Sequence, residues 1–158
     1  MLTLAKQNTS AMLTVKKILE AKSSRVYAVT PENTVYEALQ LMSVKDIGAV
    51  VVLNGETLSG IFSERDYARK IVLKGLLSKD TKVAEVMTSD VISVDAEMNI
   101  FECMELMSEK RIRHLPVVEG DKVTGMITIG DVVNAIIKSQ ATEINSLRNY
   151  ISGGAYGG

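Results

Sequence analysis

The sequence is poor in the residue types that build most metal and redox sites. It holds one cysteine, Cys103, one histidine, His114, and no tryptophan. A single cysteine excludes an intrachain disulfide and a cysteine-based zinc cluster. A single histidine without a cysteine or acidic cluster beside it is a poor candidate for a metal site. We therefore expect no metal and no catalytic cofactor.

Strong net charge and long apolar runs are also missing. The formal net charge is −1 over 158 residues, so nothing favours nucleic acid or an anionic membrane as a partner, and the few aromatic residues also argue against nucleic acid. No apolar run approaches the ~18 residues of a membrane-spanning helix. The first residues lack the apolar segment of a signal peptide. We expect a protein of the reducing cytoplasm.

The chain repeats itself with an offset of 65 residues. Residues 29–72 align with residues 94–137 without a gap, and thirteen of these 44 pairs are identical. A repeat of this length is too small to bury its own core, so we expect the two copies to pack on each other. Differences between the copies then become the best guide to function, because a shared fold does not explain them.

Each copy has the pattern of a β-α-β-β-α unit. Apolar residues keep helical spacing in both first helices, and Asn54-Gly55 is typical of a hairpin turn. We expect Thr30 and Asp95 to cap the first helices and Asp66 and Asp131 to cap the second ones. The expected strands are 25–29, 48–53 and 58–62 in the first copy, and 91–94, 115–118 and 123–127 in the second. Short amphipathic turns at 15–20 and 83–88 open the copies.

These patterns divide the chain into six segments. They are a flexible leader (1–14), the first repeat (15–75), a linker (76–82), the second repeat (83–138), a C-terminal helix (139–151) and a mobile Gly-rich tail (152–158). Ile144, Leu147 and Ile151 keep helical spacing in the C-terminal helix. Two interpretations stay open for it: packing on its own body, or binding a partner or a second copy.

One motif closes both copies. Residues 60–66 and 125–131 each contain a glycine, two apolar residues, a hydroxyl residue and, three positions later, an aspartate. The motif joins a strand to a helix, where the hydroxyl and the carboxylate can simply cap backbone N–H groups. The functional interpretation is that the aspartate accepts hydrogen bonds from a ribose diol. A phosphate would then need cations from elsewhere, because the carboxylate repels it.

Cationic residues are shared unevenly between the copies. Arg65 precedes the aspartate of the first motif, and Gly130 precedes that of the second. Residues 47–49 (Ile-Gly-Ala) align with 112–114 (Ile-Arg-His) at the start of the second strand. If the halves face each other about a pseudo-twofold axis, Arg65 meets Arg113 and His114 in one cleft, and arginine suits phosphate well. The simpler alternative is exposed arginines and a half-buried strand histidine.

The doubled pattern resembles a tandem pair of CBS domains, or Bateman module, over about residues 15–138. It is most similar to the small bacterial proteins that consist of one such pair. The resemblance implies an α/β (α+β) fold, with two pseudo-symmetric β-α-β-β-α CBS repeats packed sheet to sheet as one CBS pair. It also implies a regulatory sensor that forms a homodimer and acts through an effector protein of unknown identity.

The resemblance implies adenosine-containing ligands: AMP, ADP, ATP or NAD, with S-adenosylmethionine less favoured. The nucleotide-binding residues that it implies in the first repeat are Thr30, Val35, Ile47, Gly48, Ala49, Ser63, Arg65, Asp66, Arg113 and His114. A weaker second site would use Asp95, Ile100, Ile112, Thr128, Gly130 and Asp131. Asp95 stands where the family pattern has threonine, and the phosphate side of this site lacks cations. We therefore predict one nucleotide per chain, in the first repeat.

Two other functions stay open at this point. Catalysis would need a nucleophile with a base, paired carboxylates or a metal, and Ser63 has only Glu64 and Asp66 near it in sequence. We therefore expect no enzyme. A scaffold that kept the CBS-pair fold and binds proteins without nucleotide is the alternative. Cys103 aligns with Ala38 on a core helix face, so we expect a buried, small apolar side chain rather than a redox sensor.

Overall fold

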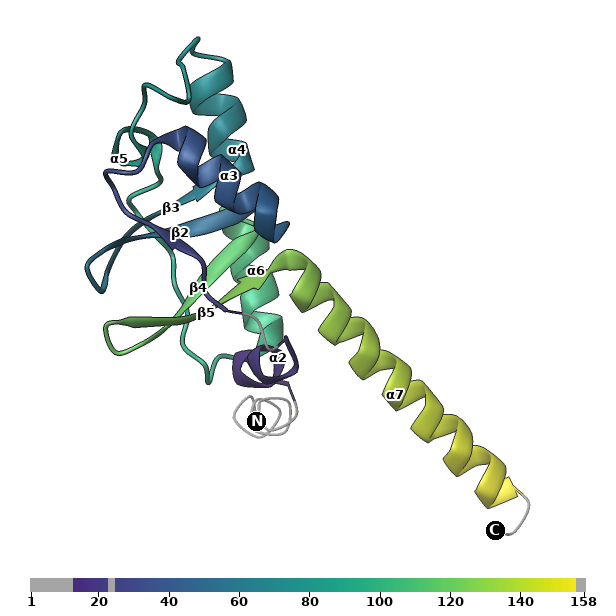
Figure 1. Cartoon of the computed structure of the whole chain (residues 1–158). Helices are drawn as coiled ribbons and strands as arrows, with labels where there is room; N and C mark the ends of the chain where they lie inside the picture. Colours follow the sequence, from purple (N-terminus) through teal and green to yellow (C-terminus); the bar gives the residue numbers. More distant parts are fainter. Residues whose placement is uncertain (1–12, 23–24, 156–158) are drawn as a thin grey trace. The chain divides into compact units, whose positions relative to one another are not determined.

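The computed structural model describes residues 13–22 and 25–155. The predicted leader and the last three residues of the predicted tail lie outside these ranges, apart from Leu13 and Thr14. In chain order (Figure 1) the elements are α2 (Val15–Lys22), β1 (Ala28–Val29), α3 (Val35–Lys45), β2 (Ala49–Asn54), β3 (Thr57–Ser63), α4 (Glu64–Asp66), the π-helical segment η1 (Tyr67–Val72), α5 (Val83–Val86), α6 (Ile100–Lys110), β4 (His114–Glu119), β5 (Lys122–Thr128) and α7 (Ile129–Ala155).

The chain folds as two compact units that do not coincide with the two sequence repeats. Unit 1 consists of Met1–Lys22, Ala96–Arg113 and Ile127–Gly158. Unit 2 consists of Ser23–Asp95 and His114–Met126. Unit 2 therefore contains most of the first repeat together with nearly all of the second hairpin, whereas unit 1 collects helices from both ends of the chain.

A three-stranded sheet organises unit 2. β1 runs parallel to β2, and β2 pairs antiparallel with β3. The predicted Asn54-Gly55 turn is confirmed. Gly55 adopts a φ of +66°, a conformation that glycine tolerates at no steric cost. The second hairpin, β4–β5, repeats this pairing. Its expected partner strand at 91–94 is reduced to one parallel bridge between Val94 and Val117.

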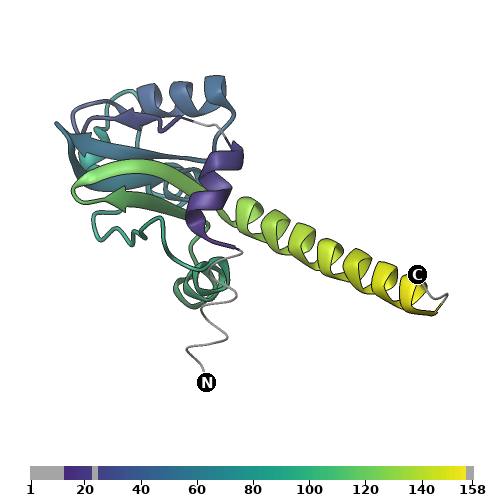
Figure 2. The same cartoon turned by 90° about the horizontal axis from the view of Figure 1, so that it is seen from below.

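Helix α3 covers one face of the unit 2 sheet (Figure 2). Its inward side chains Val35, Ala38 and Met42 are almost completely buried, as their spacing predicted. The unit 2 core consists of Val29, Val35, Ala38, Met42, Val50, Val52, Phe62, Ile71, Val83 and Val86. This apolar layer fixes the end of β3 and the start of α4, where the first motif lies.

Unit 1 is built from α2, α6 and α7. Cys103 is fully buried on α6, which confirms the prediction of a core residue. Met107 is buried on the same helix. Met104 keeps the helical spacing but is 37% exposed, so the buried face of α6 is narrower than that spacing alone predicts.

The short helices that open the repeats pack with the opposite repeat. In unit 2 the N–H of Val83 donates to the carbonyl of Asn33 at 2.8 Å, and Val83 and Val86 enter the core. In unit 1 the N–H of Val15 donates to the carbonyl of Met98 at 3.0 Å. α5, from the second repeat, therefore packs beside the start of α3 in the first repeat, and α2, from the first repeat, packs beside the start of α6 in the second. Sequence order alone does not reveal this exchange.

The first helix of each repeat begins later than predicted. Thr34 caps α3 in a reciprocal capping box: its hydroxyl accepts from the N–H of Glu37 at 3.1 Å, and the Glu37 carboxylate accepts from the N–H of Thr34 at 3.0 Å. The backbone hydrogen bond from Thr34 is the main reason that the pKa of Glu37 is lowered. The predicted cap, Thr30, was wrong: its N–H instead donates to Asn33 Oδ1 at 2.7 Å, in the preceding turn.

The second repeat repeats this displacement. Asn99 caps α6 by accepting a hydrogen bond from the N–H of Phe101 at 2.8 Å. Asp95, the predicted cap, lies four positions before Asn99 and is exposed. Both errors have one cause, because several residues before each helix are good caps by type. In the first repeat the capping box with Glu37 selects Thr34, and in the second Asn99 caps without such a box.

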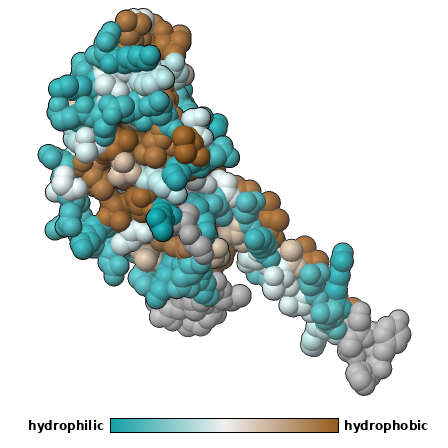
Figure 3. All heavy atoms as spheres, in the orientation of Figure 1, coloured by the Kyte–Doolittle hydropathy of each residue, from teal (hydrophilic) through white to brown (hydrophobic). Residues whose placement is uncertain are grey.

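Helix α7 joins two segments that were predicted separately. It runs without a break from Ile129 to Ala155, through the expected end near Lys138 (Figure 1). The space-filling view shows apolar and hydrophilic residues along its surface (Figure 3). Within the described ranges, no helix is both long and apolar enough to span a membrane.

Candidate functional site

The first motif folds into a capping box at the junction of β3 and α4. The N–H of Ser63 donates to Asp66 Oδ2 at 2.9 Å, and the N–H of Asp66 donates to Ser63 Oγ at 3.2 Å. Ser63 is therefore the N-cap, and Asp66 occupies the third helical position. The prediction that Asp66 itself is the cap was wrong, because the helix begins earlier than expected, at Glu64, and Ser63 is the residue that precedes it.

Asp66 is also bound by two residues that follow it in the sequence. Lys70 forms an ion pair with Asp66 Oδ1 at 3.1 Å, and the hydroxyl of Thr88 donates to the same oxygen at 3.3 Å. Lys70 also donates to the carbonyl of Val86 at 2.9 Å. With the two bonds from Ser63 (backbone and hydroxyl), the carboxylate has four donors, which equals its usual capacity. A sugar hydroxyl that binds Asp66 must therefore replace one of them.

The second motif forms the same junction at the start of α7. The N–H of Thr128 donates to Asp131 Oδ2 at 3.0 Å, and the N–H of Asp131 donates to Thr128 Oγ1 at 3.1 Å. As in the first repeat, the predicted cap Asp131 is replaced by the hydroxyl residue. Gly130 lies between them and is exposed.

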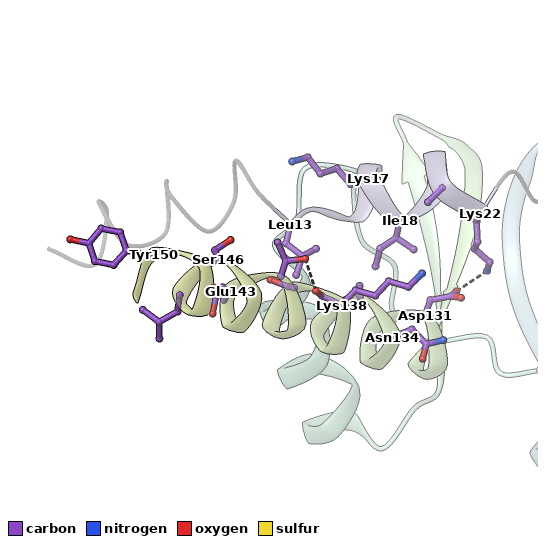
Figure 4. Close-up of a pocket in the computed structure, with 15 residues that line it drawn as sticks. Leu13, Lys17, Ile18, Lys22, Asp131, Asn134, Lys138, Glu143, Ser146 and Tyr150 are labelled. Carbon is purple, nitrogen blue, oxygen red and sulfur yellow. Dashed lines mark hydrogen bonds and ion pairs between the residues drawn. The ribbon is translucent and has the colours of Figure 1, made fainter. Parts of the chain in front are cut away.

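Lys22 supplies a cation that the sequence did not assign to the second motif. Its ammonium lies 2.7 Å from Asp131 Oδ2, and both side chains are largely buried, at 27% and 20% exposed (Figure 4). Lys22 comes from α2, the helix that packs with the opposite repeat. The expectation of a charge-free second site thus missed a residue that only the exchange of opening helices brings there.

A glycine of the first repeat meets the histidine of the second within unit 2. A Cβ built on Gly48 would lie 3.4 Å from His114 Nε2 and 3.8 Å from Glu64 Oε1. The carbonyl of Gly48 accepts a hydrogen bond from the N–H of Glu64 at 3.0 Å. The start of β2, the start of α4 and the start of β4 therefore converge where Gly48 has no side chain.

The remaining predicted residues are placed differently. Val35 and Ile100 are fully buried and Ala49 is 5% exposed, so a ligand contact from any of them stays a prediction. Ile47 and Ile112 are half-buried. Their positions at the strand starts match the framing role expected of them, without testing it.

The two predicted phosphate-binding arginines are exposed. Arg65 lies in α4 of unit 2, next to Glu64. Arg113 belongs to unit 1, where its backbone carbonyl accepts a hydrogen bond from the N–H of Ile129 at 2.9 Å. This bond is the counterpart of the Gly48–Glu64 bond. The expected meeting of both arginines with His114 stays a prediction.

Metal binding finds no support in the described part of the chain. Among those residues, no group of three or more histidine, cysteine, aspartate or glutamate side chains could hold a metal ion. The groups available to a ligand in unit 2 therefore act by hydrogen bonds and charge. They are the carboxylate of Asp66, the hydroxyl of Ser63, the imidazole of His114 and the exposed guanidinium of Arg65.

Comparison with known proteins agrees with the doubled fold. The model of the CBS domain family matches twice, at residues 12–73 and 83–138. A solved structure of a protein with CBS domains from Burkholderia ambifaria is 47% identical, with a TM-score of 0.77; the match covers 80% of this chain and 96% of that one. A CBS-domain protein from Agrobacterium tumefaciens is 36% identical, with a TM-score of 0.73, and the match covers 77% and 98%.

A curated relative extends the similarity to plants. A mitochondrial CBS domain-containing protein of Arabidopsis thaliana is 43% identical over 130 residues, which are 79% of this chain and 63% of the plant protein. The matched part thus spans less than two thirds of that relative. The two solved structures, by contrast, are matched over nearly their whole length and are small proteins with CBS domains.

Proposed function

The chain belongs to the CBS-domain family, and from this we propose that it is a regulatory module that binds one adenine nucleotide, AMP, ATP or NAD, at the site of the first repeat. Proteins built from CBS pairs are generally regulatory or sensor modules, and the relatives with the same small architecture are typically not catalytic. The nucleotide, its position and its effect on assembly are the parts that we propose.

The convergence at Gly48 is the observation that supports this site most directly. Three elements from both repeats meet where the main chain has no side chain, with the His114 ring 3.4 Å from the position of a Cβ. A flat adenine would lie against this half-buried stretch of backbone, beside Ile47. Ser63 and Asp66, at the end of β3 and in α4, are the residues that we propose for the ribose.

The positively charged residues of the site decide which ligands should bind most tightly. Arg65 and His114 would contact the phosphate, with Arg113 as a further predicted contact, because guanidinium groups form strong charge-assisted bonds to phosphate. The same groups disfavour the positively charged sulfonium of S-adenosylmethionine. A nucleotide with at least one phosphate is therefore the proposed ligand, and adenosine alone should bind weakly.

The second site is proposed to be weaker. A ribose at Asp131 would compete with the Lys22 ammonium, which lies 2.7 Å away. Asp66 is similarly engaged by Lys70 at 3.1 Å, so the difference between the sites depends on Arg65, for which the second repeat has Gly130. Occupancy of the second site should therefore appear only at higher ligand concentration.

Such a module would transmit the binding of its ligand by changing how it assembles with other chains. A ligand that binds one arrangement of the repeats better than another shifts the populations of the two. We propose a homodimer whose contacts with an effector protein respond to the bound nucleotide.

A scaffold without nucleotide is the second candidate, and one observation favours it. Asp66 already accepts four hydrogen bonds or ion-pair contacts from Ser63, Lys70 and Thr88. A carboxylate so fully engaged can serve the fold alone.

Calorimetric titration separates the two candidates. Nucleotide-free protein is titrated with AMP, ATP, NAD, S-adenosylmethionine and adenosine in parallel. Saturable binding near one phosphorylated ligand per chain supports the sensor. Absence of binding by all five supports the scaffold. Steady release of products from ATP or NAD in the same samples would instead indicate an enzyme.

A further inference from the structure

The C-terminal half of α7 carries apolar side chains in full contact with solvent. Every described residue from Gln140 to Ile151 is exposed. Ile144, Leu147 and Ile151 are 51%, 60% and 59% exposed. A single helix of this length is only marginally stable in water unless an apolar face is buried, so this stretch of α7 calls for a partner.

The exposed apolar residues follow a heptad repeat. Ile137, Ile144 and Ile151 are seven residues apart, and Leu147 stands three residues after Ile144. These are the a and d positions of a coiled coil. Extending the register backwards places Val133, which is 39% exposed, at d and leaves one polar residue, Gln140, at d.

The isoleucines of this stripe lie away from the pocket of unit 1 that α2 borders, whereas Leu147 lines that pocket. The pocket of unit 1 is bounded by α2 and by α7 residues such as Asp131, Ala135, Lys138 and Thr142 (Figure 4). At 3.6 residues per turn these positions lie about 100–160° around the helix from Ile137. A second helix can therefore cover the three exposed isoleucines, with Leu147 and Glu143 at the edge that the stripe shares with the pocket.

The charges that flank the stripe identify the partner as another copy of the same helix. In this register Glu143 takes position g, and Arg148 takes position e of the next heptad. Parallel two-stranded coiled coils pair g with the following e of the other helix, so Glu143 would meet Arg148 of a second copy, twice by symmetry. Isoleucine at a with leucine at d also favours two parallel strands.

We propose that α7 binds α7 of a second copy of this chain as a parallel, in-register, two-stranded coiled coil. The contact covers Val133 to Ile151, and Gln140 fixes the register as a polar core residue does. It requires no nucleotide, so its success or failure is independent of the proposed ligand site.

Disulfide trapping tests the orientation. In a parallel coil each a residue faces its own copy, whereas in an antiparallel coil it faces a d residue. Full-length Cys103→Ala protein carrying Ile144→Cys should form a disulfide-linked dimer under mild oxidation. The matched control, Asn149→Cys on the outer side of the helix, should not. No cross-link at 144, or equal cross-linking at 149, would overturn the proposal.

Charge exchange tests the pairing in the otherwise native chain. Glu143→Arg and Arg148→Glu should each raise the dimer dissociation constant by about 2- to 30-fold, the range expected for two exposed ion pairs. The double variant should restore the native constant. A double variant no tighter than the single ones, or a native protein that sediments as a monomer at high concentration, would contradict it.

Discussion

The imidazole of His114 lies against Gly48, with Nε2 3.4 Å from the position that a Cβ on residue 48 would occupy. These two residues are at the starts of β2 and β4, so the contact joins equivalent points of the two repeats. It is possible because the first repeat has a glycine where the second has Arg113. The asymmetry between the copies thus lets the His114 ring approach the main chain at Gly48 within unit 2.

A side chain at position 48 should affect ligand binding more than folding. In Gly48→Val the new side chain would occupy the place proposed for the base, and a Cβ at 3.4 Å needs only a small adjustment of the histidine ring. We expect at least about a 10-fold loss of AMP affinity with a midpoint of thermal unfolding within a few degrees of the native value. Calorimetry and thermal unfolding measure the two effects. Unchanged AMP affinity in a folded variant would remove Gly48 from the site.

Gly60 should not tolerate a side chain. Its Cβ would lie 2.6 Å from Met87 Sδ and 2.9 Å from the carbonyl oxygen of Thr88. The backbone oxygen cannot move easily, because Thr88 and Ile61 exchange two backbone hydrogen bonds. Gly60→Ala should therefore lower the free energy of unfolding by about 1–3 kcal/mol in urea denaturation.

A matched glycine provides the control for Gly60. A Cβ on Gly130 in α7 would approach no atom closer than 3.6 Å, and alanine is the better helix former. Gly130→Ala should leave the free energy of unfolding unchanged or raise it by up to about 1 kcal/mol. Equal destabilisation in both variants would mean that crowding at Gly60 is not the cause.

The hydroxyl of Thr88 should compete with a ribose hydroxyl for Asp66. Thr88→Val removes the hydroxyl that donates to Asp66 Oδ1, which should cost about 0.5–1.5 kcal/mol of stability in the free protein. The same change leaves an acceptor for a sugar hydroxyl, so AMP affinity should rise. Stability and affinity therefore move in opposite directions. If both fall together, the sugar does not use this oxygen.

Acid should remove the contribution of the α3 capping box. Hydrogen bonds from Thr34 lower the pKa of Glu37 below the ordinary value of a glutamate, 4.5. The ionised carboxylate therefore stabilises the folded state above that pH and loses this effect as the pH falls through the lowered pKa. Glu37→Gln should be less stable than the native protein at pH 7, and the difference should shrink below pH 4.5. Glu56→Gln, on the exposed hairpin turn, is the control and should show no such trend.

Sequence patterns predicted the elements better than their ends. The repeat, the Asn54-Gly55 turn and the burial of Cys103 follow from spacing and turn chemistry that act over a few residues. The caps were misplaced because Thr30 and Thr34 are both good capping residues by type. Only the partner three residues on, Glu37, favours the second one.

The site was harder to predict because its parts come from distant segments. Lys70 could have been found, since it stands four residues after Asp66 on a helix, a spacing that favours ion pairs. Lys22 and Thr88 gave no such signal. They reach the two aspartates only because α2 and the segment after α5 pack with the opposite repeat.

Titration of AMP and adenosine into the native protein and into Arg65→Ala tests the central proposal most directly. Loss of one charge-assisted bond, about 1.5–3 kcal/mol, should weaken AMP binding by about 10- to 150-fold and leave adenosine binding nearly unchanged. Arg69→Ala, an exposed arginine in the neighbouring η1, should change neither. Equal losses for both ligands in Arg65→Ala, or no AMP binding by the native protein, would contradict a phosphate-dependent nucleotide site in the first repeat.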